Sequence, residues 1–342
     1  MSDSPDCSAW GAGRGPDSPR IVVVGNANVD VLMGDIAPWP TPGCEVVIDR
    51  YEWRVGGAAG NTGLALAAMG VREGVDSEVI AHVGEDFLGG WLEGAMAGAA
   101  RLTRVPHPTA LTVGLTHPDG QRTFVSYLGH LVALPEERID AALDSARPGD
   151  LLLLCGYFLL PELRAQAPGI LRRARGRGML TMIDTGWPDE GWTPAVRAEV
   201  AALLPYLSAF LPNRDELLGV TGGRVTDAAD AAAEVLDMGA ERVVVKCGPS
   251  GALMASAGEQ ATYPAPSVYV QDTVGAGDTF NAGLLAGLAR GMSWADALAP
   301  AVSASALAIG SQPRRYPSWP EVAADATASS VTASCHPLSV TK

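Results

Sequence analysis

The chain has 342 residues, of which 47% are hydrophobic and 18% charged, enough for one large α/β domain or two medium ones with a sizeable core. Its formal net charge is −14 and no basic stripe is visible, which argues against a nucleic-acid partner. The apolar stretch at residues 201–211 is too short to span a bilayer, and residues 1–20 lack the apolar core of a signal peptide. The five widely spaced cysteines form no Cys-x-x-Cys pair, which fits a reducing compartment. We therefore expect a cytoplasmic protein with no membrane partner.

Short β-branched runs alternate along the chain with longer segments rich in Ala and Leu. Strands are predicted at residues 21–24, 79–83, 151–154, 179–183, 209–211 and 242–246. Helices are predicted between them, at residues 58–69, 86–99, 161–175, 194–204 and 227–238. This alternation predicts a mostly parallel sheet with helices on both faces.

Two segments, at about residues 31–55 and 103–128, show strand-like alternation with turn signals and no helical pattern. The second contains Pro118-Asp119-Gly120, which predicts a turn between strands at 111–116 and 122–127. Because both segments interrupt the α/β pattern without supplying helices, we predict that they form a small protruding β-sheet, a lid. Composition predicts a disordered leader at 1–20, one domain over 21–324 and a loose tail at 325–342.

The most informative segment spans residues 272–283 and reads Asp-Thr-Val-Gly-Ala-Gly-Asp-Thr-Phe-Asn-Ala-Gly. The turn Gly275-Ala276-Gly277 opens a helix, and its free N–H groups with the helix dipole predict an anion-binding nest. Asp278 lies at the mouth of this nest, where a carboxylate can accept the proton of a hydroxyl attacking a phosphoryl group. Taken alone, Gly-Ala-Gly-Asp is equally typical of a helix cap after a glycine turn.

The complete string resembles the C-terminal signature of the PfkB, or ribokinase-like, kinase family, whose core reads Asp-Thr-x-Gly-Ala-Gly-Asp. Further motifs follow in the order of that family and extend the resemblance over about residues 21–322: Gly25–Asp30, Gly56–Asn61, Val83–Gly89, Asn213–Glu216 and Lys246–Gly251. The resemblance implies a ribokinase-like three-layer α/β/α sandwich with a small β-sheet lid. It also implies an ATP-dependent kinase that uses Mg²⁺ and phosphorylates a small sugar or a nucleoside, with Asp278 as base.

Residues near the first strand are the candidates for binding the acceptor. Asp30 stands where the family places an Asp that binds sugar hydroxyls, although an Asx turn is the alternative. Asn28 precedes it by two residues. Gly56-Gly57 either forms a simple tight turn or belongs to the acceptor site, and Asn61, about one helical turn later, is predicted to contact the substrate.

A second group of residues is assigned to the nucleotide. Asn213 and Glu216 match the family's Asn-x-x-Glu motif, which implies that Glu216 holds a Mg²⁺-bound water, and the same spacing is typical of a capping box. The segment from Lys246 to Gly251 resembles the strand and turn that pass the nucleotide; Gly248 and Gly251 either admit it or form an ordinary hairpin turn. Lys246, Gly248, Gly251 and Thr273 are assigned to this site, and the small-residue helix at 301–308 to the adenine slot.

Three features remain open. The segment Asp184–Trp192 follows a strand and is either a substrate or phosphate contact or a packed loop. Arg122 either reaches the substrate or lies on a solvated lid strand. The stretch Gly310–Tyr316 departs from the pattern of family members activated by K⁺, which makes a monovalent-cation site near Asp272 doubtful.

The acceptor itself is less constrained. A neutral hexose or pentose is our first choice and a nucleoside the second, with Trp39, Tyr51, Trp53 and Tyr127 as a possible aromatic lid wall. A sugar phosphate is disfavoured because the arginines in and near the lid look scattered: Arg50, Arg54, Arg101, Arg104 and Arg122. A non-catalytic sugar-binding protein on the same fold is a third reading, which the retained Asp278 opposes. The resemblance also implies that the lid can pair in a homodimer.

Overall fold

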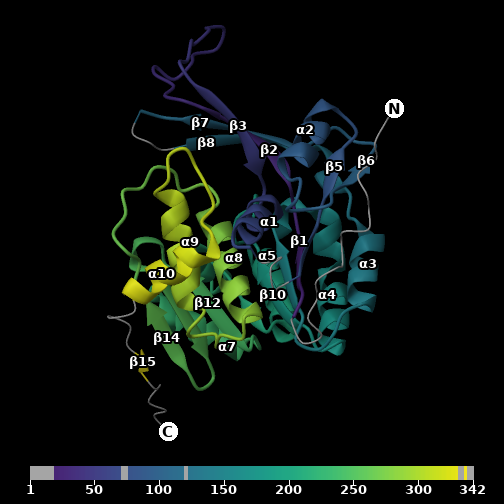
Figure 1. Ribbon diagram of the computed structural model, residues 1–342, viewed down its shortest axis with the longest axis vertical. Helices are drawn as coiled ribbons and strands as arrows, with labels where there is room; N and C mark the ends of the chain where they lie inside the picture. The colour runs from purple at the N-terminus through teal and green to yellow at the C-terminus, as the bar shows by residue number, and fades with distance from the viewer. Residues whose placement is uncertain (1–18, 71–75, 119–121, 330–334, 337–342) are drawn as a thin grey trace.

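The computed structural model describes residues 19–70, 76–118, 122–329 and 335–336 and is built on a nine-stranded sheet (Figure 1). Its strand order is β15 (Cys335–His336), β14 (Gln260–Tyr263), β13 (Ala252–Ser256), β12 (Arg242–Lys246), β11 (Ala209–Phe210), β10 (Leu180–Asp184), β9 (Leu151–Cys155), β1 (Ile21–Val24) and β4 (Ser77–Ile80). The strands from β12 to β4 are parallel, and β13, β14 and β15 are antiparallel. This confirms the predicted, mostly parallel sheet.

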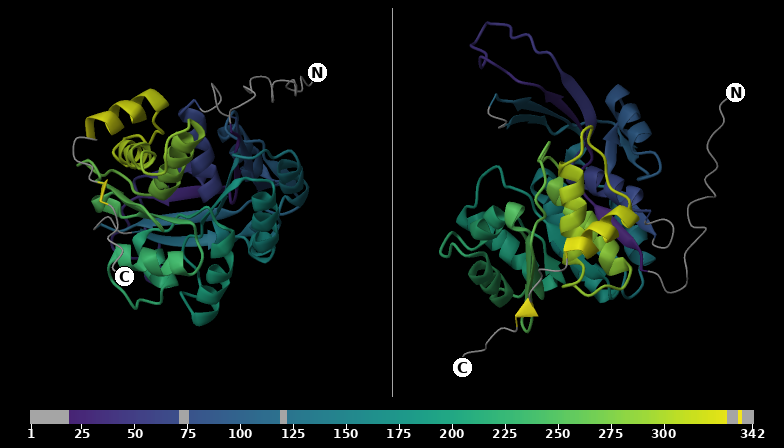
Figure 2. Two further views of the ribbon diagram at one scale, coloured as in Figure 1. Left: turned by 90° about the horizontal axis from the view of Figure 1, so that it is seen from below. Right: turned by 60° about the vertical axis from the view of Figure 1, so that its left-hand side comes forward.

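Helices cover both faces of the sheet (Figure 2). Successive residues of β1 point to opposite faces, so Ile21 and Val23 enter one core and Val22 and Val24 the other. The first core is covered by α1 (Ala58–Ala68), α8 (Ala276–Ala289) and α9 (Leu298–Ile309), with α2 (Phe87–Ala95) beside them and α10 (Trp319–Ser329) packed on α9. The second is covered by α3 (Glu136–Asp144), α4 (Pro161–Gly176), α5 (Pro194–Leu203), α6 (Arg214–Val220) and α7 (Ala228–Asp237). The result is the three-layer sandwich that was predicted.

A second sheet of four strands stands above the carboxyl ends of the parallel strands and forms the lid (Figures 1 and 2). Its order is β3 (Tyr51–Gly56), β2 (Asn28–Met33), β7 (Leu111–Thr116) and β8 (Arg122–Tyr127). Asp30 pairs with Arg54 on β3 and with Thr112 on β7, while Arg122 pairs with Thr116. Because paired residues share a face and side chains alternate along a strand, Asp30, Arg54 and Arg122 lie on one face of the lid.

The boundaries of several predicted elements were wrong. The predicted strand at 79–83 divides into β4 and β5 (His82–Gly84), and β5 pairs with β6 (Thr103–Val105), so residues 103–105 are not part of the lid. The lid itself begins earlier than predicted, at Asn28. Of the predicted turn at 118–120, Asp119 and Gly120 lie outside the described residues.

Both predicted ends of the domain also differ. Arg20 is buried and its backbone N–H donates to Asp150, so it belongs to the domain rather than to the leader, whose residues 1–18 lie outside the described residues. Helix α10 continues to Ser329, and β15 pairs with β14, so the segment predicted as a loose tail is structured in these places. Helix α10 begins with a capping interaction, in which Ser318 donates to Glu321, that its sequence could have revealed. None of the described helices is both long and apolar enough to cross a membrane.

Candidate active site

The predicted site residues gather where the parallel strands end, beneath the lid. Asp184 is the last residue of β10 and Lys246 the last residue of β12. Helices α1 and α8 pack against each other, and their N-terminal residues Asn61 and Asp278 are in contact. Open α/β sheets bind their ligands at this edge, because loops and helix N-termini converge there.

Asp278, the third residue of α8, is held by a chain of hydrogen bonds. The Asn61 Nδ2 donates to its Oδ2 at 2.8 Å, and the Asn61 Oδ1 in turn accepts from the Tyr316 hydroxyl at 2.7 Å. Burial, together with the nearby charge of Asp184, raises the pKa of Asp278 to about 7. Asn61 was predicted to contact the substrate; in the structure its Nδ2 donates to Asp278 and its Oδ1 is held by Tyr316, so Asn61 helps to orient Asp278.

Of the three amides predicted to bind an anion at the start of α8, two have no partner within the described backbone. Gly275 is the N-cap with φ of 69°, a left-handed conformation that favours glycine. The N–H of Ala276 donates to the Thr273 carbonyl at 3.1 Å, so this amide is already used. Within the described residues, the N–H groups of Gly277 and Asp278 have no such acceptor, as is usual for the first turn of a helix.

Asp30 and its neighbours, which the sequence assigned to the acceptor, lie together on the lid side of the site, called the acceptor side below. The Asn28 Nδ2 donates to the Asp30 Oδ1 at 2.8 Å, and burial raises the pKa of Asp30 to about 6. A Cβ at Gly56 would overlap the carboxylate of Asp30, so this position favours glycine. Gly57 caps α1 with φ of 84°, and the N–H groups of the first turn donate to Asn26, a residue that was not predicted. The alternative that Asp30 only forms an Asx turn is wrong, since it lies within a strand.

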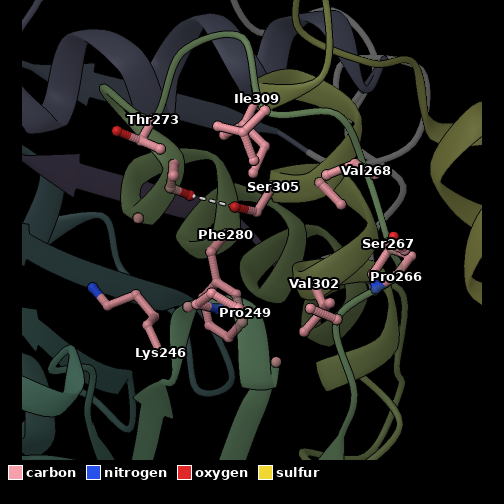
Figure 3. A pocket seen from close by; sticks show the side chains of 17 residues that line it. Lys246, Pro249, Pro266, Ser267, Val268, Thr273, Phe280, Val302, Ser305 and Ile309 are labelled. Atoms are coloured by element: carbon pink, nitrogen blue, oxygen red, sulfur yellow. Dashed lines mark hydrogen bonds between the residues drawn. The ribbon is translucent and has the colours of Figure 1, made fainter. Parts of the chain in front are cut away.

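A pocket of about 570 Å³ opens on the other side of the α8 N-terminus (Figure 3). It is lined by Lys246, Gly248, Pro249, Gly251, Ala265, Pro266, Ser267, Val268, Val270, Thr273, Ala276, Gly277, Phe280, Val302, Ser305, Ala306 and Ile309. All four residues assigned to the nucleotide from the segments at 246–251 and 272–283 therefore lie in its wall, as do three residues of the predicted adenine helix. The Ser305 hydroxyl donates to the Ala276 carbonyl at 3.0 Å and joins α9 to the start of α8. The volume and the apolar wall suit a flat heterocycle.

Lys246 stands at one end of this pocket, across from Val302 (Figure 3), and is paired with a buried acid. Its Nζ donates to the Asp184 Oδ2 at 2.6 Å, and the Asn281 Nδ2 donates to the same oxygen at 2.6 Å. Although burial opposes its charge, Asp184 and Glu216 hold the pKa of Lys246 above its usual value. Asp184 thus belongs to the site, whereas Trp192 of the same segment packs on Trp187 and on Phe158. The sequence analysis did not assign Asn281 to the site. Its one signal is that it is a polar residue inside the mostly apolar helix α8.

The Asn-x-x-Glu motif forms a complete capping box at the start of α6. The Asn213 N–H donates to the Glu216 Oε2 at 2.8 Å, and the Glu216 N–H donates to the Asn213 Oδ1 at 2.9 Å. Burial and the charge of Asp184 raise the pKa of Glu216. No cluster of three or more metal-ligating side chains occurs in the part of the chain that the structure describes. The carboxylates of Glu216 and Asp184 are too few to surround a metal ion. They suit a Mg²⁺ ion that keeps waters and phosphate oxygens as its other ligands.

Two lid arginines that were predicted to be scattered converge instead on Asp272, just before the glycine turn. Arg54 on β3 and Arg122 on β8 each form an ion pair with Asp272 at 2.5 Å. The side chain of Arg122 is therefore paired and only 18% exposed, although most of β8 is exposed to solvent. The prediction holds for Arg50 and Arg104, which pair elsewhere with Asp35 and Glu93.

The predicted aromatic lid wall is wrong. Tyr51 and Trp53 alternate with Arg54 along β3, and Tyr127 lies on the face of β8 opposite Arg122, so all three point away from the acceptor side. The ring of Trp39 stacks on the ring of His117, with 4.6 Å between the ring centroids. A nucleoside base therefore has no aromatic partner among Tyr51, Trp53 and Tyr127.

Known proteins resemble the chain along most of its length. A family model described as pfkB family carbohydrate kinase matches residues 18–321. An uncharacterized sugar kinase, YegV, of Escherichia coli is 29% identical over 81% of this chain and 84% of its own, and aminoimidazole riboside kinase of Salmonella typhimurium is 30% identical over 85% and 88%. The structure of Arabidopsis thaliana ribokinase complexed with ribose and ATP has a TM-score of 0.75 at 23% identity and covers 90% of this chain and 99% of that one.

Proposed function

The chain belongs to the pfkB family of carbohydrate kinases, and from that membership we propose that it transfers the γ-phosphoryl group of Mg-ATP to a hydroxyl of a small sugar, with Asp278 as general base. The observation that supports this most is the position of Asp278. It lies between an apolar pocket suited to a nucleotide and the acceptor side around Asp30, beside two open amides. Its pKa of about 7 suits proton transfer at neutral pH.

In the proposed step the acceptor oxygen bonds to the γ-phosphorus while the bond from that phosphorus to the bridging oxygen of ADP breaks. The hydroxyl proton passes to the Asp278 carboxylate, which Asn61 orients. The N–H groups of Gly277 and Asp278 donate to the oxygens of the transferring group, where negative charge develops. The Nζ of Lys246 lies 3.6 Å from the point that a Cβ added to Gly277 would occupy. We propose that Lys246 contacts the phosphates of ATP beside this turn.

Glu216 and the adjacent Asp184 would hold Mg²⁺ through bound water. When bound, the ion would neutralise part of the charge of the ATP phosphates. A monovalent cation forms no part of the proposal, because guanidinium groups already surround Asp272. Closure of the lid over the acceptor would exclude water and favour transfer to the sugar over hydrolysis of ATP.

A nucleoside is the second candidate acceptor, supported by the similarity to aminoimidazole riboside kinase. Against it stands the outward direction of Tyr51, Trp53 and Tyr127, which leaves a base without these stacking partners. The non-catalytic reading is set aside by membership of an enzyme family together with the retained Asp278. A sugar is therefore the proposed acceptor.

A coupled assay of ADP release from Mg-ATP tests this proposal. We expect turnover that depends on an added sugar, across a panel of neutral sugars, sugar acids, sugar phosphates and nucleosides. Turnover with nucleosides alone would replace the proposed acceptor class. ADP release that no member of the panel stimulates would contradict the proposed transfer reaction.

We also propose that the lid pairs with the lid of a second copy. The lid face away from the acceptor carries exposed apolar side chains, among them Tyr51, Val125 and Tyr127. Exposed apolar side chains gathered on one face of a sheet favour association. Light scattering is expected to give twice the mass of the chain, and Val125→Glu to give the mass of one chain; a single-chain mass for the unaltered protein would refute the pairing.

A further inference from the structure

Three arginine side chains from separate segments surround Asp272. Arg54 comes from β3, Arg122 from β8, and Arg314 from the segment after α9; their side chains are 12%, 18% and 9% exposed. Arg54 and Arg122 pair with Asp272 at 2.5 Å, and the Nη1 of Arg314 lies 3.9 Å from its Oδ2. We refer to Arg54, Arg122 and Arg314 as the arginine cluster.

The arginine cluster holds more hydrogen-bond donors than Asp272 can accept. Each guanidinium has five N–H groups, and one oxygen of Asp272 already accepts from the backbone N–H of Val274. Four buried nitrogen atoms lack an acceptor among the described residues: the Nη2 of Arg54, the Nε of Arg122, and the Nε and Nη2 of Arg314. Burying unsatisfied charged donors is unfavourable, and anionic oxygens from a ligand would satisfy them.

The arginine cluster lies on the acceptor side of the site. Arg54 is the strand partner of Asp30, and the Arg314 Nη2 lies 3.1 Å from the Cβ position of Gly275, the N-cap of α8. The charge of Arg314 lowers the pKa of both Asp30 and Asp278, against the larger effect of burial, so it is electrostatically close to both. The phosphates of ATP have a separate cation, Lys246, on the pocket side of α8.

We propose that the acceptor is an anionic sugar, whose phosphate or carboxylate group is bound by Arg54, Arg122 and Arg314 while another hydroxyl receives the phosphoryl group. This inference rests on the proposed kinase function and specifies its acceptor. Guanidinium groups suit the task because their paired N–H groups match two oxygens of either anion. It replaces the neutral sugar that was the first choice from sequence, which assumed scattered arginines.

Initial rates with matched acceptors test the proposal. Fructose 1-phosphate and fructose 6-phosphate are compared with fructose, ribose 5-phosphate with ribose, and gluconate with glucose. At least one anionic sugar is expected to exceed its neutral partner by about 100-fold or more in kcat/KM, because several charge-assisted hydrogen bonds are lost with the neutral form. The phosphate and acid pairs distinguish the two anions.

Two variants connect this preference to the arginine cluster. Arg54→Gln and Arg122→Gln are each expected to raise KM for the preferred anionic sugar about 10–150-fold and to change KM for its neutral partner little. Arg122→Lys, which keeps the charge, should recover part of the loss. Arg50→Gln is the matched control, since Arg50 is an exposed lid arginine paired with Asp35, and it should leave both KM values unchanged.

Calorimetric titration without ATP separates failure of this inference from failure of the kinase proposal. Binding of the sugar phosphates or gluconate that is weakened in folded Arg122→Gln supports the anion site even if no acceptor is phosphorylated. Turnover of neutral sugars with equal or better kcat/KM, unaffected by Arg54→Gln and Arg122→Gln, would overturn the anion site and leave the kinase intact. Absence of both anion binding and anion turnover would overturn it as well.

Discussion

Replacement of Asp278 by asparagine is expected to lower kcat for phosphoryl transfer by about 10²–10⁴-fold, the usual contribution of a general base. Asparagine keeps the size of the side chain but cannot accept the hydroxyl proton. The contact with Asn61 and the fold of α8 should persist, so the KM values for ATP and the sugar should change little. Initial rates of ADP release, with circular dichroism as a check of folding, measure the effect.

A matched control exists on another helix. Asp230 is the third residue of α7, as Asp278 is of α8, and it is exposed and is not one of the residues assigned to the site. Asp230→Asn should therefore leave kcat unchanged. If Asp278→Asn also retained nearly full activity, Asp278 would be no more than a favourable charge at a helix N-terminus.

The pH profile gives a second readout of the same base. Burial raises the pKa of Asp278 to about 7, and the base acts only when ionised, so kcat/KM should rise with pH and level off above about 7. Below about pH 6 the decline should steepen, because Asp30, with a pKa raised to about 6, is also protonated. In Asp278→Asn the step near pH 7 should disappear. A profile that is flat between pH 5.5 and 8 would contradict the assignment.

Replacement of Lys246 by methionine is expected to destabilise the fold by about 3–5 kcal/mol, the usual cost of removing one partner from a buried ion pair. The side chains of Lys246 and Asp184 are only 12% and 10% exposed, so the variant leaves the Asp184 carboxylate buried without its cation. Adding Asp184→Asn should return much of the lost stability, since the uncompensated charge is then gone. Urea unfolding of the two single variants and the double variant measures the coupling.

The control for this cycle is an exposed ion pair. Arg224 pairs with Glu234 at 2.6 Å with its side chain 61% exposed, so Arg224→Met should cost less than about 1 kcal/mol. If Lys246→Met were as mild as that, or if Asp184→Asn made it worse, the buried pair would not have the role assigned to it.

Sequence alone predicted the positions of site residues that belong to one continuous motif. The string at 272–283 predicted the helix, the glycine turn and the position of Asp278, because each follows from residues that are neighbours in the chain. The same holds for the capping box of Asn213 and Glu216.

Contacts between distant segments could not be placed in this way. The arginine cluster joins residues 54, 122 and 314 to Asp272, which depends on the strand register of the lid and on the path of the chain after α9. The spacing placed Asn61 near the site, but its partners, Asp278 and Tyr316, lie more than two hundred positions away (|i−j| of 217 and 255). A pattern read along the chain therefore predicted where Asn61 lies but not which distant residues of the chain it contacts.

The site residues are divided between the lid sheet and the core sheet, which has a consequence for how such an enzyme can evolve. Asp30, Arg54 and Arg122 are carried by the lid, whereas Asp278, Lys246 and the nucleotide pocket belong to the core. Apart from Arg314, the proposed acceptor contacts could therefore change through substitutions on four short strands while the core remains under unchanged selection for phosphoryl transfer. Descendants of one ancestral kinase would then diverge fastest in the lid, and grafting a lid from a relative would be the most direct route to a new acceptor.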